Sequence, residues 1–333
     1  MNAISASAPG KIVVCGEYAV LWGAPAVCMA VNRRAEVSIE SATGPDHCIT
    51  AKGVIDGEYR FDIGENGLPH WQNAAGLRLV DEIWRELGVG RIAPVRMTVD
   101  TSGFVDPLAR VKYGFGSSAA VAVALCAALG REGPAATSGS HAAAAHRRYQ
   151  GGRGSGVDVA CSIAGGLIGF RMAGGDQPDV LAWPSGLRYQ VLWSGRASDT
   201  ARQVGKMQAV DQRDGALQNL VQAAEKVASH WARGNSSAIV EAIDAYIDAL
   251  TSFDQRFNVG IFEAGHANLT QLARDRGLVY KPCGAGGGDT GIAMTAAQDG
   301  RLEGFVAEAL RLGFSALDVN MDSTGLVVQR EAA

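Results

Sequence analysis

Three glycine-rich segments, each with a lysine inside it or close to it, carry the residues best suited to binding phosphate. A glycine backbone lets a phosphate oxygen approach its N–H groups, and a lysine ammonium is a compact charge that neutralises the oxygen. Half of the six lysines lie at these segments, which favours a phosphate site over three ordinary turns. The segments are Ala8-Pro9-Gly10-Lys11, Gly114-Phe115-Gly116-Ser117-Ser118-Ala119-Ala120 after Lys112, and Gly284-Ala285-Gly286-Gly287-Gly288-Asp289 after Lys281.

The second segment leads directly into an apolar stretch, residues 119–129, that predicts a buried helix. The first turn of a helix presents unpaired N–H groups and about half a positive charge, so this helix would point a phosphate cradle at its ligand. A tight turn before a core helix is the alternative. The chain has no G-x-x-x-x-G-K-[ST] motif, which excludes a common P-loop. The G-x-G-x-x-G match at residues 286–291 precedes a strand-like segment, which argues against a Rossmann site.

One aspartate, Asp158, follows a further glycine-serine segment and opens another apolar helical stretch. Its carboxylate would either orient a lysine or a metal ion or serve only as a helix cap, and the residues alone leave both roles open. The histidines form no H-x-x-x-H or Cys/His ligand pattern, so surface or hydrogen-bonded roles are expected for them. His146 stands nearest the predicted site. Tyr18 either lines the pocket or fills the core.

Helical and strand-like periodicities alternate along the chain and predict an α+β fold. The turn-rich stretch at residues 174–186 is the expected boundary between an N-terminal nucleotide-binding domain, residues 1–185, and a C-terminal domain, residues 186–333. The expected strands are residues 3–8, 12–15, 95–99, 167–170, 189–193, 292–295, 316–319 and 325–328. The expected helices are residues 73–87 after Asn73 as a cap, 119–129, 138–150, 157–164 and 302–312, with mostly helical structure over 200–276.

The composition is that of an ordinary globular protein, with 47% hydrophobic and 19% charged residues. A net charge of −4 argues against the broad basic surface that nucleic acids and acidic membranes require. No apolar run approaches the length of about 20 residues that spans a bilayer, and no signal-peptide pattern opens the chain, so a cytoplasmic protein is expected. The six cysteines lack C-x-x-C spacing and are expected to be free thiols, with only Cys283 near the surface.

The order of these motifs resembles that of the GHMP kinases, a superfamily that joins galactokinase, homoserine kinase, mevalonate kinase and phosphomevalonate kinase. The resemblance spans residues 7–296 and rests on the three segments together with Gly16-Glu17-Tyr18-Ala19-Val20-Leu21. Asp289 and Trp193-Ser194-Gly195 are most similar to the phosphomevalonate kinases, whereas Phe115 stands where leucine is usual. The resemblance implies an N-terminal α+β domain like domain 2 of ribosomal protein S5, a ferredoxin-like C-terminal domain, and a site between them.

The resemblance also implies a role for each motif residue. Lys112 and Asp158 would be a catalytic pair, with Lys11 as a third catalytic group that contacts phosphate or substrate. ATP would be bound by Gly114, Phe115, Gly116, Ser117, Ser118 and Ala119. The substrate would be contacted by Lys11, Tyr18, Arg147, Arg148, Ser155, Gly284, Ala285, Gly286, Gly287 and Asp289. Arg147 and Arg148 have a second interpretation as a solvated helix face.

Mg²⁺ is the second cofactor that the resemblance implies, and Ser117, Ser118 and Asp158 would hold it. The glutamate that binds this ion in mevalonate kinases has no clear counterpart, because Glu132 is the only acidic residue between Ser118 and Asp158. Mg²⁺ commonly keeps several waters and takes few protein ligands, so one carboxylate can suffice.

The expected reaction is phosphoryl transfer from ATP to (R)-5-phosphomevalonate, giving the 5-diphosphate of the mevalonate (isoprenoid) pathway. An alcohol acceptor must lose a proton, whereas a phosphomonoester has a second pKa near 6 and is already mostly dianionic at neutral pH. The alternatives are a mevalonate kinase, another GHMP small-molecule kinase, or a non-catalytic GHMP-fold binding protein, which would be expected to lack Lys112 or Asp158. The sequence carries no indication of oligomeric state.

Overall fold

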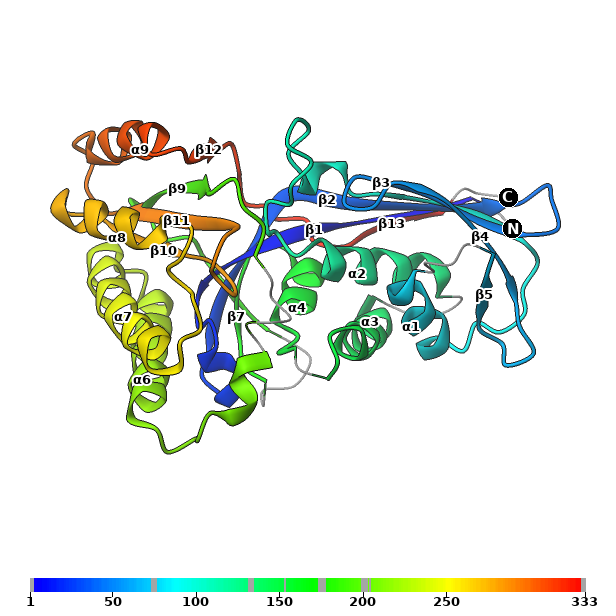
Figure 1. The fold of residues 1–333 in the computed structure, drawn as a ribbon, viewed down its shortest axis with the longest axis horizontal. Coiled ribbons are helices and arrows are strands. Elements are labelled where there is room, and N and C mark those ends of the chain that lie inside the picture. Colours follow the sequence, from blue (N-terminus) through cyan, green and yellow to red (C-terminus); the bar gives the residue numbers. More distant parts are fainter. Residues whose placement is uncertain are drawn as a thin grey trace.

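The computed structural model describes residues 3–72, 77–130, 135–152, 154–172, 178–198, 203 and 205–330. Helices pack on two β-sheets in this part of the chain (Figure 1). The strands are β1 (Ile4–Cys15), β2 (Ala26–Ser41), β3 (His47–Lys52), β4 (Gly57–Ile63), β5 (Pro69–Trp71), β6 (Val95–Asp100), β7 (Leu167–Phe170), β8 (Asp179–Leu181), β9 (Arg188–Trp193), β10 (Val279–Pro282), β11 (Thr290–Thr295), β12 (Ser315–Leu317) and β13 (Val327–Arg330). The helices are α1 (Arg78–Glu86), α2 (Ser117–Leu129), α3 (Ala135–Tyr149), α4 (Val157–Ala164), α6 (Gly215–Arg233), α7 (Ser236–Phe257), α8 (His266–Asp275) and α9 (Arg301–Arg311), with 3-10 helices η1 (Ala19–Trp22), η2 (Ser102–Phe104) and η3 (Lys206–Ala209).

The larger sheet has the order β13-β1-β2-β6-β3-β4-β5, and β7 pairs with both β2 and β8. Along the second half of β2, buried Ala35, Val37 and Ile39 alternate with exposed or half-buried neighbours, as expected of a strand with one solvent face. Helix α2 packs against β1 and β2, and α1, α3 and α4 complete the layer on that face (Figure 1). Because α2 is enclosed by this sheet and these helices, it is apolar on almost every side.

The smaller sheet has the order β10-β11-β9-β12, with each neighbouring pair antiparallel. Its residues alternate between two cores. Val191 and Ile292 belong to the cluster that contains α6 and α7, whereas Leu192 and Ala293 belong to the cluster that contains α8 and α9. This part of the molecule therefore has three layers, with the sheet between two pairs of helices.

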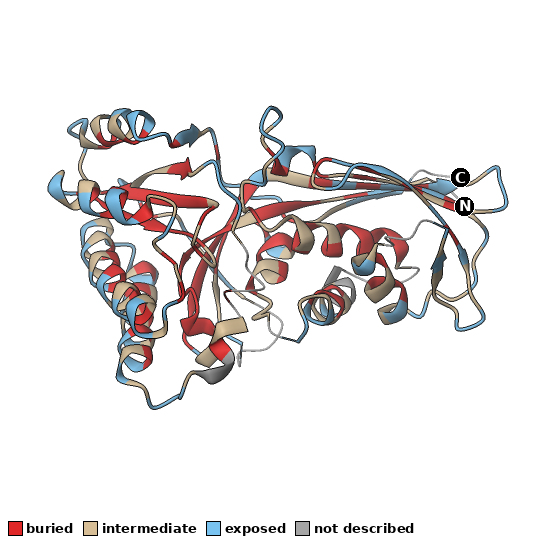
Figure 2. Cartoon of the chain, viewed as in Figure 1, coloured by how far each residue is buried: buried red, intermediate tan, exposed pale blue. Residues whose placement is uncertain are grey.

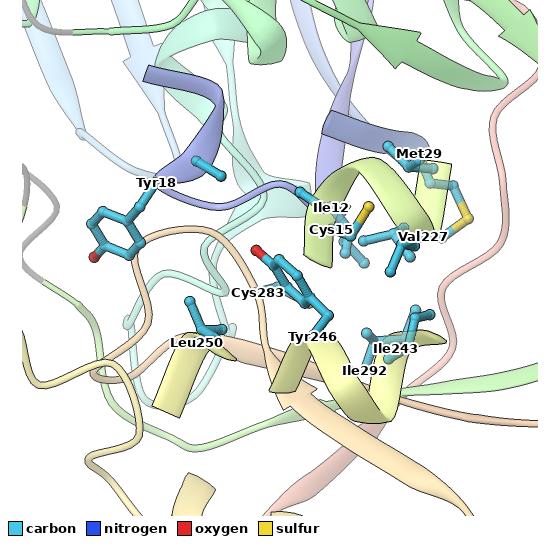
Figure 3. Packing of buried hydrophobic residues seen from close by; sticks show 14 of the residues in the cluster. Ile12, Cys15, Tyr18, Met29, Val227, Ile243, Tyr246, Leu250, Cys283 and Ile292 are labelled. Atoms are coloured by element: carbon cyan, nitrogen blue, oxygen red, sulfur yellow. The ribbon is translucent and has the colours of Figure 1, made fainter. Parts of the chain in front are cut away.

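A shared core joins the two sheets. Figure 3 shows Ile12 and Cys15 of β1 close to Ile243 and Tyr246 of α7, all members of one cluster. Figure 2 shows that buried residues continue along the strands from one half of the molecule to the other. Residues that lie between the two halves therefore pack against buried side chains of both halves.

The end of the described chain returns to its beginning. Strand β13 pairs antiparallel with the start of β1, from Ile4 opposite Arg330 to Ser7 opposite Val327. Residues 188–317 supply the smaller sheet, whereas residues 327–330 join the larger one. The predicted C-terminal domain, residues 186–333, therefore contributes a strand to the sheet of the other half.

The α+β class predicted from the sequence is confirmed, as are helices at α2, α3, α4 and α9 and strands at β6, β7, β9 and β11. The predicted break between two strands around Ala8-Pro9-Gly10-Lys11 is wrong, because β1 continues through it with a register shift between Pro9 and Gly10. The strand predicted at 316–319 lies at Ser315–Leu317, and that predicted at 325–328 lies at Val327–Arg330. Asn73, the predicted helix cap, lies outside the described residues.

The cysteines are free thiols, as predicted. The expectation that Cys283 lies near the surface is wrong, because its side chain is buried and loss of hydration raises its pKa to about 12. Within the residues described here, no helix has both the length and the apolar character that crossing a bilayer requires.

Candidate active site

A cavity of about 940 Å³ lies between the two halves of the chain, with walls from β1, α2, α4 and the third glycine segment. It brings together segments that are more than 100 residues apart in the sequence. The predicted site residues that line it are Lys11, Tyr18, Lys112, Gly114, Phe115, Gly116, Ser117, Ser118, Ser155, Asp158, Gly284, Ala285 and Asp289. Ala119, Arg147, Arg148, Gly286 and Gly287 are not among its lining residues.

The second glycine segment ends at the first turn of α2, which begins at Ser117 on the cavity wall. Gly114 and Gly116 have φ values of 91° and 72°, in the left-handed region that favours glycine. A Cβ on Gly116 would lie 2.9 Å from Cε of Lys11, so a side chain here would push against that lysine. The backbone N–H of Lys11 also donates to the carbonyl of Phe115 at 2.8 Å. Strand β1 and the start of α2 are therefore in direct contact and form one wall of the cavity. Ala119 lies in the same first turn of α2 but is fully buried.

Lys11 and Lys112 both line the cavity, but Lys281 does not. Lys281 is fully buried and forms an ion pair with Glu17, whose other carboxylate oxygen accepts from the Tyr246 hydroxyl at 2.9 Å. The interpretation of Lys281 as a third phosphate lysine is therefore wrong, because its charge is already neutralised inside the core. Through Glu17, the ion pair and the Tyr246 hydrogen bond instead link β10 and α7 to the segment that follows β1.

Asp158 lies in the first turn of α4, and its side chain is 16% exposed at the cavity wall. Among the ion pairs of the described residues, none joins Asp158 to Lys112, the lysine predicted to be its catalytic partner. The carboxylate on which the charges of these lysines act is instead that of Asp289. Lys11 and Lys112 both act to lower the pKa of Asp289, although loss of hydration is the larger effect and raises that pKa overall.

Asp289 is fixed by hydrogen bonds at the end of the third glycine segment. Its Oδ2 accepts from the Ser198 hydroxyl at 2.6 Å, and its Oδ1 accepts from the Ser198 N–H at 3.1 Å. A Cβ on Gly114 would overlap the Asp289 side chain, so the second and third glycine segments are in direct contact. The third segment therefore packs directly against the second.

The other residues of the third segment form two groups. Some line the cavity, and the others contact the protein on the side away from the cavity. Gly284 and Ala285 line the cavity, and the Tyr18 hydroxyl donates to the Ala285 carbonyl at 2.5 Å. Tyr18 thus lines the cavity and is also largely buried. Gly286 faces away from the cavity, because a Cβ there would lie 2.6 Å from the Ile261 carbonyl. Gly287 faces Gln203 and the Gly260 carbonyl in the same way.

A buried histidine supports the third segment from behind. Nε2 of His266 lies 3.0 Å from the Gly288 carbonyl, which can only accept, so this nitrogen carries the proton. Nδ1 then accepts from the Tyr280 hydroxyl at 2.8 Å. Loss of hydration lowers the pKa of His266 to about 4, so the ring is neutral in the folded protein at pH 7.

The pKa of His266 predicts a loss of stability in mild acid. Above pH 6.5 the ring is neutral both folded and unfolded, whereas between pH 6.5 and 4 only the unfolded chain takes up the proton. One pKa unit corresponds to about 1.4 kcal/mol, so the free energy of unfolding should fall by roughly 3 kcal/mol over this range. Urea unfolding at several pH values measures it. In His266→Gln this acid dependence should shrink, and an identical dependence in the variant would contradict the assignment.

The two arginines predicted to bind the acceptor lie elsewhere on α3. Arg148 pairs with Glu82 and Glu86 of α1, and Arg147 is exposed. A different arginine, Arg78 at the start of α1, lines the cavity, with its guanidinium 5.1 Å from the centre of the Tyr149 ring. Arg78 could not be predicted from the sequence, because no motif surrounds it and only the fold brings α1 to the cavity.

Other cavity residues were also missed by sequence reasoning. They are Glu17, which belongs to a quoted motif without an assigned role, and Tyr149, Gln150 and Ser198. His146 was noted only as the nearest histidine, yet its Nε2 lies 3.0 Å from the Ser118 hydroxyl. The one sequence signal for His146 was its position shortly before the glycine-serine segment that leads to Asp158.

The donors on the cavity wall fit Mg²⁺ better than a softer metal. Ser117, Ser118 and Asp158 offer hydroxyl and carboxylate oxygens, which are the ligands Mg²⁺ prefers. In the described part of the chain, no three His, Cys, Asp or Glu side chains gather into a metal-binding group. A Mg²⁺ ion held partly by water and by nucleotide phosphates is compatible with this sparse donor set.

Residues 76–166 match the family described as GHMP kinases N terminal domain. The chain is 28% identical to a phosphomevalonate kinase from Streptomyces sp. (strain CL190), over 88% of this chain and 90% of that protein. It is 29% identical to a mevalonate kinase from Aeropyrum pernix, over 51% of each chain. Its fold matches that of Streptococcus pneumoniae phosphomevalonate kinase in complex with phosphomevalonate and AMPPNP, with a TM-score of 0.76, 18% identity and coverage of 98% of this chain and 99% of that one.

Proposed function

We infer that this chain, which has the fold of the GHMP kinases and carries their N-terminal domain, transfers the γ-phosphoryl group of ATP to (R)-5-phosphomevalonate. One observation carries this proposal. A single cavity collects the α2 N-terminus, the ammonium groups of Lys11 and Lys112, and the carboxylates of Asp158 and Asp289. The relative aligned over 88% of the chain is a phosphomevalonate kinase, which favours that acceptor over mevalonate.

The reaction balances without a protein base. An oxygen of the acceptor phosphate attacks the γ-phosphorus, the bond from that phosphorus to the β,γ-bridging oxygen breaks, and ADP leaves with the electron pair. Because the acceptor phosphate is mostly dianionic at neutral pH, no proton has to be removed before attack. The obstacle is instead the repulsion between two anions.

The cavity is arranged to counter this repulsion. Lys11 lies against the phosphate cradle, and we assign it to holding the acceptor and γ-phosphoryl oxygens together. We assign Lys112 to stabilising the negative charge that develops on the leaving oxygen while the γ-phosphoryl group is transferred. The backbone carbonyl of Lys112 accepts from the Trp193 indole at 3.2 Å, which holds this part of the chain against the second half of the molecule.

Asp158 and Asp289 have different parts in this proposal. Asp158, with Ser117 and Ser118, would hold Mg²⁺, which supplies positive charge to the nucleotide phosphates when bound. The charges of both lysines act on Asp289, which is itself fixed by Ser198, and we assign Asp289 to keeping the two ammonium groups at the cavity before ligands arrive. Arg78, on the wall beside Tyr149, is the candidate partner for further negative charge on the ligands.

A direct assay separates the possible acceptors. Purified protein receives Mg-ATP with phosphomevalonate, mevalonate or homoserine, and ADP release is measured. We expect ADP release with phosphomevalonate to exceed that with either other acceptor by at least about 100-fold in kcat/KM, because a site that pairs a substrate phosphate rejects acceptors that leave its charges unpaired. Release with mevalonate alone would overturn the acceptor and favour a mevalonate kinase, the activity named for the relative that matches half of the chain.

A further inference from the structure

His146 connects two groups of the candidate metal site that come from different helices. It lies near the end of α3, and its side chain is only 2% exposed. Its Nε2 lies 3.0 Å from Oγ of Ser118, in the first turn of α2, and its Nδ1 lies 3.9 Å from Oδ2 of Asp158, in the first turn of α4. One imidazole ring thus faces both side chains.

The partners of the ring determine where its proton lies. The Asp158 carboxylate, 3.9 Å from Nδ1, is too far away for a hydrogen bond, but its negative charge favours placing the proton of a neutral ring on Nδ1. Nε2 then has a free lone pair and accepts a hydrogen bond from the Ser118 hydroxyl. Because a hydroxyl has one proton and two lone pairs, Ser118 is left with only lone pairs to present to the cavity.

A hydroxyl with this orientation suits a cation and not a phosphate oxygen. We propose that His146 is a positioning residue that fixes the Ser118 hydroxyl as a ligand for the nucleotide-bound Mg²⁺. Ser117 and the backbone N–H groups at the start of α2 remain as donors to phosphate oxygens. This assignment narrows the metal ligands proposed above from Ser117, Ser118 and Asp158 to Ser118 and Asp158, and it leaves Ser117 to the phosphate oxygens.

The other carboxylates of the cavity show why such a ligand matters. Glu17 is paired with Lys281, and Asp289 is hydrogen-bonded to Ser198. Among the carboxylates that line the cavity in the described residues, Asp158 is the one with neither a lysine in an ion pair nor a hydrogen bond from a serine hydroxyl. With so few anionic ligands, an oriented hydroxyl contributes a larger share of the affinity for the cation.

This inference rests on the proposed function only in requiring that the cavity binds a metal-nucleotide complex. A purely structural role for His146 is the competing explanation, since its ring also stacks near Tyr149 with centroids 6.1 Å apart. A structural role predicts that removing the ring weakens nucleotide binding with and without metal to the same degree. A positioning role predicts a loss confined to the metal-bound nucleotide.

Calorimetric titration with AMPPNP, once with excess Mg²⁺ and once with EDTA, separates these roles. In His146→Leu, we expect the Kd of AMPPNP with Mg²⁺ to rise by about 10-fold or more, as is typical when a residue that orients a metal ligand is lost. The Kd in EDTA should change by less than about two-fold. In His146→Gln, whose amide oxygen can accept from Ser118, most of the affinity should return.

Two further variants complete the design. Ser118→Ala should reproduce the metal-dependent loss, and adding His146→Leu to it should cause little additional loss, because both act on one hydroxyl. His141→Leu is the matched control, since His141 lies on the same helix and contacts Glu86 outside the cavity. It should bind AMPPNP as the wild type does.

Equal loss in Mg²⁺ and in EDTA, or no loss in either, would overturn the assignment of His146. If His146→Leu does not fold, Ser118→Ala and His146→Gln decide the question by the same comparison. The acceptor has no part in this measurement. A protein that shows the metal-dependent loss but does not phosphorylate phosphomevalonate would leave this inference standing and refute only the proposed acceptor.

Discussion

Lys281→Met is expected to lower the free energy of unfolding by roughly 3–5 kcal/mol, the usual cost of leaving one member of a buried ion pair without its partner. Methionine keeps the aliphatic length of lysine but leaves the Glu17 carboxylate charged and buried beside Tyr246. Thermal or urea unfolding measures the loss. The double variant Lys281→Met with Glu17→Gln should lose less than the sum of the two single changes, because the uncompensated charge is removed.

Lys226→Met is the matched control for this prediction, because Lys226 is exposed on α6. It should change the free energy of unfolding by no more than about 0.5 kcal/mol. A Lys281→Met protein with unchanged stability and weakened nucleotide binding would show that Lys281 reaches the ligands. That result would restore the interpretation drawn from the glycine pattern.

Lys112→Ala should lower turnover by about 100-fold or more while changing the affinity for AMPPNP only slightly. The charge of Lys112 is expected to matter most as negative charge moves between the phosphoryl group and the leaving oxygen, so its loss affects the transition state more than the bound nucleotide. Steady-state kinetics gives kcat and kcat/KM, and calorimetry gives the AMPPNP affinity.

Lys52→Ala provides the comparison for Lys112, because Lys52 is an exposed lysine on β3 that does not line the cavity. Its turnover should equal that of the wild type. If Lys112→Ala keeps full turnover, Lys112 has no part in the reaction. If kcat is unchanged and only the affinity for AMPPNP falls, the role of Lys112 is binding alone.

Sequence patterns were sufficient to predict those helices and strands whose character is set by neighbouring residues in the chain. The apolar run after Ser118 predicted α2, and its glycine-serine start predicted a phosphate cradle at that helix terminus. The glycine at position 10 was misinterpreted as part of a loop. Its actual requirement is long-range, because a Cβ on Gly10 would lie 2.6 Å from the Phe115 carbonyl and 2.7 Å from the Phe104 ring. Glycine is needed there for close packing of a strand.

The residues that sequence reasoning missed share the same physical origin. Arg78, His146 and Ser198 reach the site from α1, α3 and the segment after β9, so their neighbours are set by helix and sheet packing. The partners of charged side chains could not be predicted from the sequence for the same reason. Nothing in the local sequence distinguishes Arg148, which pairs with α1, from an arginine that faces the cavity.

The pairing of β13 with β1 has a consequence for synthesis on the ribosome. Residues 4–7 emerge more than 300 residues before their hydrogen-bonding partners at 327–330. Until those partners have been synthesised, the start of β1 is an unprotected sheet edge that can pair with another nascent chain. Closure of this edge by β13 is therefore the step that converts an aggregation-prone intermediate into the finished sheet.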